Sequence, residues 1–178
     1  MYLKINFDNI DYLKLGNERQ QKAYTDIIQH KILEILKPYH PIVTGTIPIE
    51  IDLPESDIDI ICKCKDHNEF KSVVTHHFSK MQGFHLYTRK QNDKKVTIAE
   101  FRTENFLIEL FAQNIPTKQQ NAYLHMITEH AILQEKGNSF QQEIIKLKAS
   151  GLKTEPAFAK LLGLKGDPYE EILKLQRK

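Results

Sequence analysis

The sequence predicts an α/β (α+β) fold, a small mixed sheet with flanking helices followed by a C-terminal helical part. Apolar runs of strand length are confined to residues before about 115, and helix-start signals separate them from helical segments. Beyond residue 116 only helical patterns remain. We therefore expect a core over residues 1–115 and a helical region over 116–178 packed on it.

The first elements are expected to be mainly helical. A turn over 9–15 closes at Gly16, and Asn17 caps the next helix. The apolar positions of that helix fall roughly on one face: Tyr24, Ile27, Ile28, Ile32, Ile35 and Leu36. Pro38 is expected to end it, a short strand over 41–44 follows, and 46–55 is expected to be extended and irregular.

The remaining elements follow from alternation and capping. Strand 57–64 precedes a helix over 67–81 that Asp66 caps. Three further strands are expected, the last two antiparallel to each other, at 84–89, 96–102 and 106–111. Four helices complete the chain, with starts at Thr117, Ser139, Thr154 and Asp167.

Composition narrows the function classes. The 178 residues carry a net charge of +2, which does not argue for nucleic acid as a partner. No apolar run approaches the roughly 20 residues of a membrane span, and the first residues do not form a signal-peptide core. Two cysteines are too few for a disulfide framework, so a cytoplasmic location is expected. The sequence does not define an oligomeric state.

Two carboxylates in one strand are the strongest chemical signal. Asp57 and Asp59 alternate with Ile58 and Ile60, so both carboxylates share one face while the isoleucines point into the core. Two like charges this close repel unless a cation lies between them. Carboxylate oxygens are ligands that Mg²⁺ prefers, and the strand therefore predicts a magnesium site.

Further residues complete a site for phosphoryl-type transfer. Gly45 leaves room for a phosphate at the backbone, and Thr46 adds a hydroxyl donor. Glu109 lies between Ile108 and Leu110 in the sequence. It is a candidate for a further metal ligand or for the base that deprotonates an acceptor hydroxyl. Glu100 is a competing third carboxylate. Ser56 is a nucleotide-binding candidate, and three residues are candidate substrate contacts: His125, Gln113 and Gln120.

Other polar residues have simpler interpretations. Cys62 and Cys64 share the face of the core isoleucines and are expected to be small core residues, although a zinc site with His67 is an alternative. The C-terminal lysines form either a solvated helical surface or a collar for a polyanion: Lys146, Lys148, Lys153, Lys160 and Lys165.

The spacing of these residues resembles the polymerase-β-type nucleotidyltransferase superfamily. Gly45-Thr46, then Asp57-Ile58-Asp59-Ile60, then Glu109 between apolar residues is similar to its pattern of Gly-Gly or Gly-Ser, two acidic residues on one strand and a third on a later strand. A closer resemblance is to an uncharacterised bacterial domain-of-unknown-function family within that superfamily. It rests on five segments: 45–48, 108–111, 120–126, 153–159 and 166–169.

The resemblance implies a nucleotidyltransferase-like fold and Mg²⁺-dependent transfer of a nucleoside monophosphate from an NTP to a hydroxyl. Asp57, Asp59 and Glu109 would hold one or two Mg²⁺ ions, and Gly45 and Thr46 would receive the phosphates. The acceptor, a small molecule or a protein, is not implied. The alternatives are a non-catalytic nucleotide- or protein-binding module, a toxin–antitoxin-type enzyme that modifies a partner protein, and a metal-dependent phosphohydrolase.

Overall fold

The computed structural model describes residues 5–176, and these divide into two compact units. The first comprises the described residues up to Thr44 together with Asp57–Gln120. The second comprises Gly45–Ser56 and the described residues from Asn121 onward. The sequence placed residues 45–56 in the α/β core, whereas here they group with the C-terminal helices.

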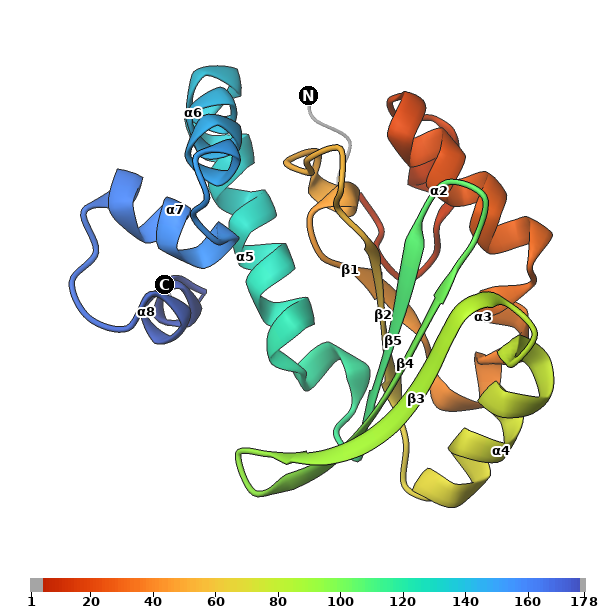
Figure 1. The fold of residues 1–178 in the computed structure, drawn as a ribbon. Helices are drawn as coiled ribbons and strands as arrows, with labels where there is room; N and C mark the ends of the chain where they lie inside the picture. Colours follow the sequence, from red (N-terminus) through yellow and green to blue (C-terminus); the bar gives the residue numbers. More distant parts are fainter. Residues whose placement is uncertain (1–4, 177–178) are drawn as a thin grey trace. The chain divides into compact units, whose positions relative to one another are not determined.

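The first unit is built on a five-stranded mixed sheet (Figure 1). Its strand order is β1-β2-β5-β4-β3, and β2 runs parallel to β5 while the other neighbours are antiparallel. The strands are β1 (Ile42–Thr44), β2 (Ile58–Lys63), β3 (Gln82–Gln91), β4 (Lys94–Arg102) and β5 (Leu107–Gln113). The α+β class and the antiparallel β4–β5 pair are therefore confirmed.

Helices of the same unit lie to one side of this sheet in Figure 1. They are α1 (Asp11–Lys14), α2 (Glu18–Gln29), α3 (Ile32–Ile35) and α4 (His67–Phe78). The unit also contains the 3₁₀ turns η1 (Lys37–Tyr39) and η3 (Thr117–Gln119). Phe78 of α4 stacks on Phe101 of β4 with ring centroids 4.6 Å apart. Ile60 and Leu110, on the central strands, are fully buried. This face of the sheet is the hydrophobic core of the unit.

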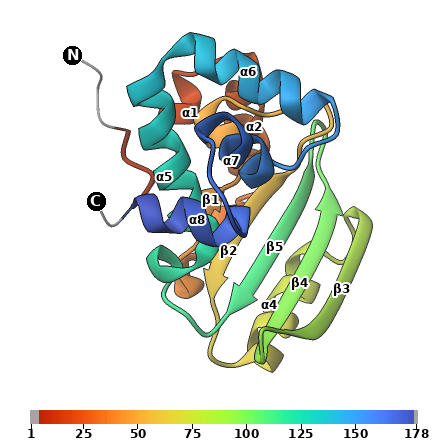
Figure 2. The same ribbon diagram turned by 90° about the vertical axis from the view of Figure 1, so that its left-hand side faces the viewer.

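The second unit contains four helices and one 3₁₀ turn. They are η2 (Ile47–Ile49), α5 (Asn121–Lys136), α6 (Asn138–Ala149), α7 (Thr154–Leu162) and α8 (Pro168–Leu175). Consecutive helices pack on one another, and α5 also contacts α8 and η2 (Figure 2). The side chains of α6 attach residues 45–56 to this unit, because Gln141 donates to the Glu50 carbonyl (2.9 Å) and Lys148 donates to the Ile51 carbonyl (2.5 Å).

The predicted long N-terminal helix is broken into two. Asn17 caps α2 as expected, and its side chain and that of Gln20 form a reciprocal capping box. The helix ends at Gln29, however, because Lys31 has a left-handed backbone (φ 52°), and Pro38 lies inside η1 rather than ending a helix. The predicted apolar face is also wrong at Ile28, which is exposed, while Asp26 is buried.

Two C-terminal helix starts differ from those expected. Thr117 and Gln120 do not form the start of a helix, and α5 begins at Asn121. The side-chain Nε2 of Gln120 instead donates to the carbonyls of Cys62 and Ile115 at 3.0 and 2.9 Å. α6 begins at Asn138, after Gly137 and without a side-chain cap, rather than at a cap by Ser139. The Asp167 cap of α8 is confirmed. None of the described helices is long and apolar enough to cross a membrane.

Candidate functional site

Three carboxylates lie in one row across the centre of the sheet. The β2–β5 register places Asp59 opposite Glu109, and the β4–β5 register places Glu100 opposite Glu109 from the other side. Directly paired residues share a face, with their Cβ atoms about 5 Å apart. Thr44 on β1 and His85 on β3 extend the row to both edges of the sheet. We call Asp59, Glu109 and Glu100 the carboxylate row.

Asp57 lies next to this row. It directly precedes β2 and is two residues before Asp59, a spacing that puts both side chains on one face where the strand pleat extends to Asp57. Its charge acts on Glu109, whose carboxyl pKa is raised by burial first, then by Asp57 and by Glu100. Arg89 on β3 opposes this shift. The row is therefore a partly buried concentration of negative charge.

The chemistry of this donor set suits a divalent cation. Burial is the largest cause of the raised Glu109 pKa, and a cation would remove the smaller part that comes from repulsion by Asp57 and Glu100. Mg²⁺ accepts carboxylate oxygens as ligands. Within residues 5–176, however, no group of three or more His, Cys, Asp or Glu side chains is placed to hold a metal. The backbone therefore brings the carboxylates into register, but their side chains do not converge on one point.

The nucleotide-phosphate candidates belong to the second unit. Gly45 directly follows β1 and has φ +85°, a conformation that favours glycine. Thr46 precedes η2, and its carbonyl accepts from the amides of Ile49 and Ile51 at 3.3 and 3.2 Å. Ser56 closes a turn, since its hydroxyl accepts from the Leu53 amide at 2.9 Å. Phosphate binding by Gly45, Thr46 and Ser56 stays a prediction.

The candidate substrate contacts have different surroundings. Gln113 ends β5 on the face of Glu109, four residues further along the strand. Gln120 is buried and bonded to backbone carbonyls. His125 is buried within the second unit, with Nε2 2.9 Å from the Tyr169 carbonyl and Nδ1 3.5 Å from Glu155. Of the three, Gln113 alone lies on the face of the carboxylate row.

The zinc alternative has no support from the cysteines. Cys62 and Cys64 are buried, and burial raises the pKa of both thiols, to about 11 for Cys64. His67 instead has Nδ1 2.8 Å from the Thr97 hydroxyl. A zinc ligand must be a thiolate, which this burial disfavours.

The sequence did not single out two further groups. Lys63, Lys65 and Lys95 line a pocket. Lys63 and Lys65 are two residues apart at the end of a strand, and this spacing could have indicated that both lie on one face. Glu129 is a buried acid within α5, and no local pattern distinguishes it from a solvated helix residue. The collar of C-terminal lysines does not include Lys148, which is buried.

Comparison with known proteins gives the family. The sequence profile of the family described as Domain of unknown function (DUF4269) matches residues 25–175. The chain belongs to this family. No curated protein matches the DUF4269 chain.

Solved structures share the fold of the DUF4269 chain. It is similar to the polymerase core of TRAMP, an RNA surveillance complex (TM-score 0.54, 14% identity, 93% of this chain and 58% of that one). It is also similar to a structure of the GLD-2/RNP-8 complex (TM-score 0.52, 11% identity, 84% and 59%). The chain spans 58% and 59% of the length of these two structures. At these identities the likeness shows the fold, which is nucleotidyltransferase-like.

Proposed function

We propose that the DUF4269 chain transfers a nucleoside monophosphate from an NTP to a hydroxyl group, with Mg²⁺. The observation that carries the proposal is the register of Asp59 with Glu109, together with the action of Asp57 on Glu109. In this proposal three acidic side chains, from β2, the residue before it and β5, act on one side of the sheet. The nucleotidyltransferase-like fold supports the same reaction class, although fold alone does not establish activity.

Each residue has a stated role in this proposal. Asp57, Asp59 and Glu109 would hold Mg²⁺, which when bound polarises the phosphoryl oxygens and neutralises developing charge. The acceptor oxygen forms a bond to the α-phosphorus, the bond from the α-phosphorus to the bridging oxygen breaks, and pyrophosphate leaves. In the alternative arrangement Asp57 and Asp59 would hold Mg²⁺, and Glu109 would take the proton of the acceptor hydroxyl.

The test measures label transfer from each of the four α-³²P-labelled NTPs to a panel of hydroxyl acceptors. The panel includes an RNA oligonucleotide, because one of the similar structures is the core of an RNA surveillance complex. We expect Mg²⁺-dependent transfer that falls about 100-fold or more in Asp57→Asn, Asp59→Asn or Glu109→Gln, the size typical of losing one electrostatic contact to a transition state. Glu100→Gln tests the competing carboxylate.

Asp93→Asn is the matched control. Asp93 is exposed in the β3–β4 turn with φ +60°, which asparagine tolerates, so the same loss of charge leaves the fold intact. Equal activity in wild type and Asp57→Asn, or an equal loss in Asp93→Asn, contradicts the proposal.

A second candidate function is a nucleotide-binding module without catalysis. It is favoured by the finding that no described group of three acidic side chains converges on a metal position. Calorimetry with Mg-ATP on wild type and on Asp57→Asn/Asp59→Asn separates the two functions. Binding that the double variant loses, without turnover on any acceptor, supports the module.

A further inference from the structure

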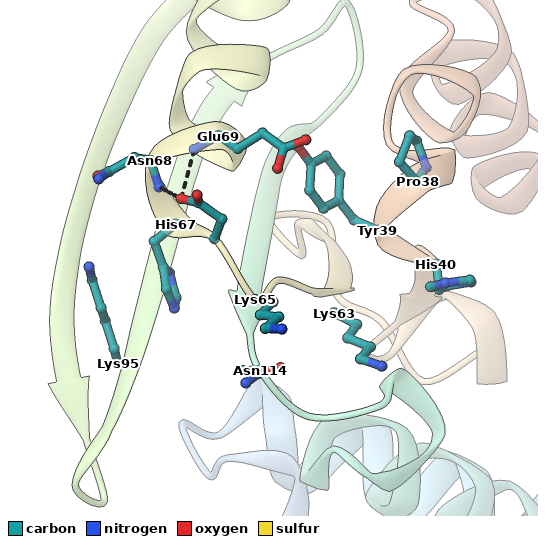
Figure 3. A pocket seen from close by; sticks show the side chains of 11 residues that line it. Pro38, Tyr39, His40, Lys63, Lys65, His67, Asn68, Glu69, Lys95 and Asn114 are labelled. Atoms are coloured by element: carbon teal, nitrogen blue, oxygen red, sulfur yellow. Dashed lines mark hydrogen bonds between the residues drawn. The ribbon is translucent and has the colours of Figure 1, made fainter.

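A pocket of about 770 Å³ lies within the first unit, at the end of β2 (Figure 3). It is bordered by the end of β2 at Lys63, the start of α4 at His67 and the start of β4 at Lys95. Asn114, directly after β5, and Pro38 and Tyr39 of η1 also line it. Its volume is within the range of about 300–1,000 Å³ that small-molecule sites occupy.

Three lysines give this pocket its chemistry. Lys63, Lys65 and Lys95 line it and are exposed. Within the part of the chain that the structure describes, no carboxylate forms an ion pair with any of the three, whereas five other lysines do so: Lys22, Lys118, Lys136, Lys146 and Lys174. The described residues therefore do not hold the three lysines in ion pairs, although Asp66 and Glu69 also line the pocket and Lys95 acts electrostatically on Asp66.

The two acidic residues of the lining have other roles. The Asp66 carboxylate accepts from the backbone amides of Asn68 and Glu69 at 2.8 and 3.1 Å, and these hydrogen bonds lower its pKa. Figure 3 shows Glu69 turned toward Tyr39 rather than toward Lys63 and Lys65, and its charge contributes to the raised pKa of the Tyr39 phenol. Lys95 also acts on Asp66, so Lys63 and Lys65 are the lysines of the lining that have no acidic partner among the described contacts.

The pocket is distinct from the carboxylate row. Lys63 ends β2, whereas Asp59 lies near its start. They are four positions apart along the strand, which corresponds to about 13 Å at roughly 3.3 Å per residue. None of the residues that line the pocket belongs to the carboxylate row, and binding in the pocket is measured separately from the proposed transfer reaction.

We propose that this pocket binds the phosphate group of a small phosphorylated molecule. Lysine ammonium groups bind phosphate as point charges, and Lys63, Lys65 and Lys95 supply three of them. Pro38 and Tyr39 form an apolar wall against which the rest of such a molecule packs. The volume accommodates a ligand the size of a nucleoside monophosphate rather than a lone ion.

The test is calorimetry on the full chain in EDTA, so that no divalent cation contributes, with pyrophosphate, adenosine 5′-monophosphate and adenosine as probes. We expect both phosphorylated probes to bind and adenosine not to bind. Lys63→Gln and Lys95→Gln are each expected to weaken binding about tenfold, the effect of one charge-assisted hydrogen bond of about 1.5 kcal/mol. Since both side chains are exposed, the substitutions leave the core unchanged.

Lys94→Gln is the matched control, because Lys94 is the exposed neighbour of Lys95 and does not line the pocket. Its affinity for the probes should equal that of wild type. Equal weakening in Lys94→Gln and Lys95→Gln would show only diffuse charge and overturn the proposal. So would tighter binding of a single-stranded oligonucleotide that all three substitutions weaken, since that marks a nucleic-acid surface instead of a pocket.

An amide NMR spectrum locates the ligand independently of affinity. Pyrophosphate is expected to shift the signals of residues 65–68 and Asn114, which border the pocket. Shifts confined to Asp57, Asp59 and Glu109 would place the ligand on the carboxylate row and overturn the proposal. Failure here leaves the transfer reaction intact, because that reaction is read from Mg²⁺-dependent label transfer.

Discussion

Replacing Glu129 with glutamine should make the protein more stable at neutral and higher pH. Glu129 is 4% exposed, and its Oε1 has no hydrogen-bond partner within the described residues. Burial, and then the charge of Glu155, raise its pKa to about 8, while the charge of Lys148 acts to lower it. Burial also lowers the pKa of Lys148, so both groups are pushed toward their uncharged forms.

The size of the effect follows from linkage between protonation and folding. The pKa of Glu129 is higher in the folded protein than in the unfolded chain, so protonation of Glu129 stabilises the folded state. This stabilisation is complete below the unfolded pKa near 4.5 and is lost as the pH rises through the folded pKa of about 8. A difference of one between the folded and unfolded pKa values corresponds to about 1.4 kcal/mol of stability. Between pH 5 and pH 8, wild type should therefore lose about 3 to 4 kcal/mol through this one group, a loss that Glu129→Gln removes.

Urea unfolding at a series of pH values from 5 to 8 measures this difference. We expect the free energy of unfolding of Glu129→Gln to exceed that of wild type by a margin that grows with pH. Glu135→Gln, an exposed position on the same helix, is the control and should follow wild type. A destabilisation of about 3 kcal/mol or more in Glu129→Gln would instead show a buried ion pair with Lys148, and would refute the reasoning.

Two further stability predictions concern the first unit. Asp26 is buried and accepts hydrogen bonds from the Thr103 hydroxyl (2.5 Å) and from the backbone amide and the side-chain amide of Asn105 (3.0 and 2.7 Å). Asp26→Ala should lower the free energy of unfolding in urea by about 3 kcal/mol, because three polar groups lose their acceptor. A loss below about 1 kcal/mol would show that this contact does not hold the β4–β5 turn. Phe101→Ala should cost about 4 kcal/mol, because Phe101 is fully buried and stacked on Phe78. Phe84→Ala, at a less buried position, should cost clearly less, and equal losses would contradict the assignment of the core face.

Local signals in the sequence predicted many of these elements. The Asn17 cap depends on residues three apart, and the Asp66 and Asp167 caps depend equally on near neighbours. The prediction that Asp57 and Asp59 share a face likewise uses only the two-residue period of a strand. Such features need no knowledge of the rest of the chain.

Features set by distant residues were not predicted. The burial of Asp26 goes together with the turn at 103–105, to which Asp26 is hydrogen-bonded from nearly eighty positions away. The break at Lys31, where the backbone is left-handed, was not predicted either. The place of Glu100 in the carboxylate row depends on the β4–β5 register, which no single strand specifies. Gln120 resembles a helix-start residue in sequence, but its amide instead satisfies carbonyls from two other segments.

The grouping of residues 45–56 with the C-terminal helices determines how the protein can be dissected. The chain passes from one unit to the other three times: after Thr44, after Ser56 and after Gln120. No single cleavage therefore separates the two units. A fragment that stops at Gln120 keeps Glu50 and Ile51 but lacks Gln141 and Lys148. The carbonyls of Glu50 and Ile51 would then have lost the side chains that donate hydrogen bonds to them, and the segment 45–56 would be exposed.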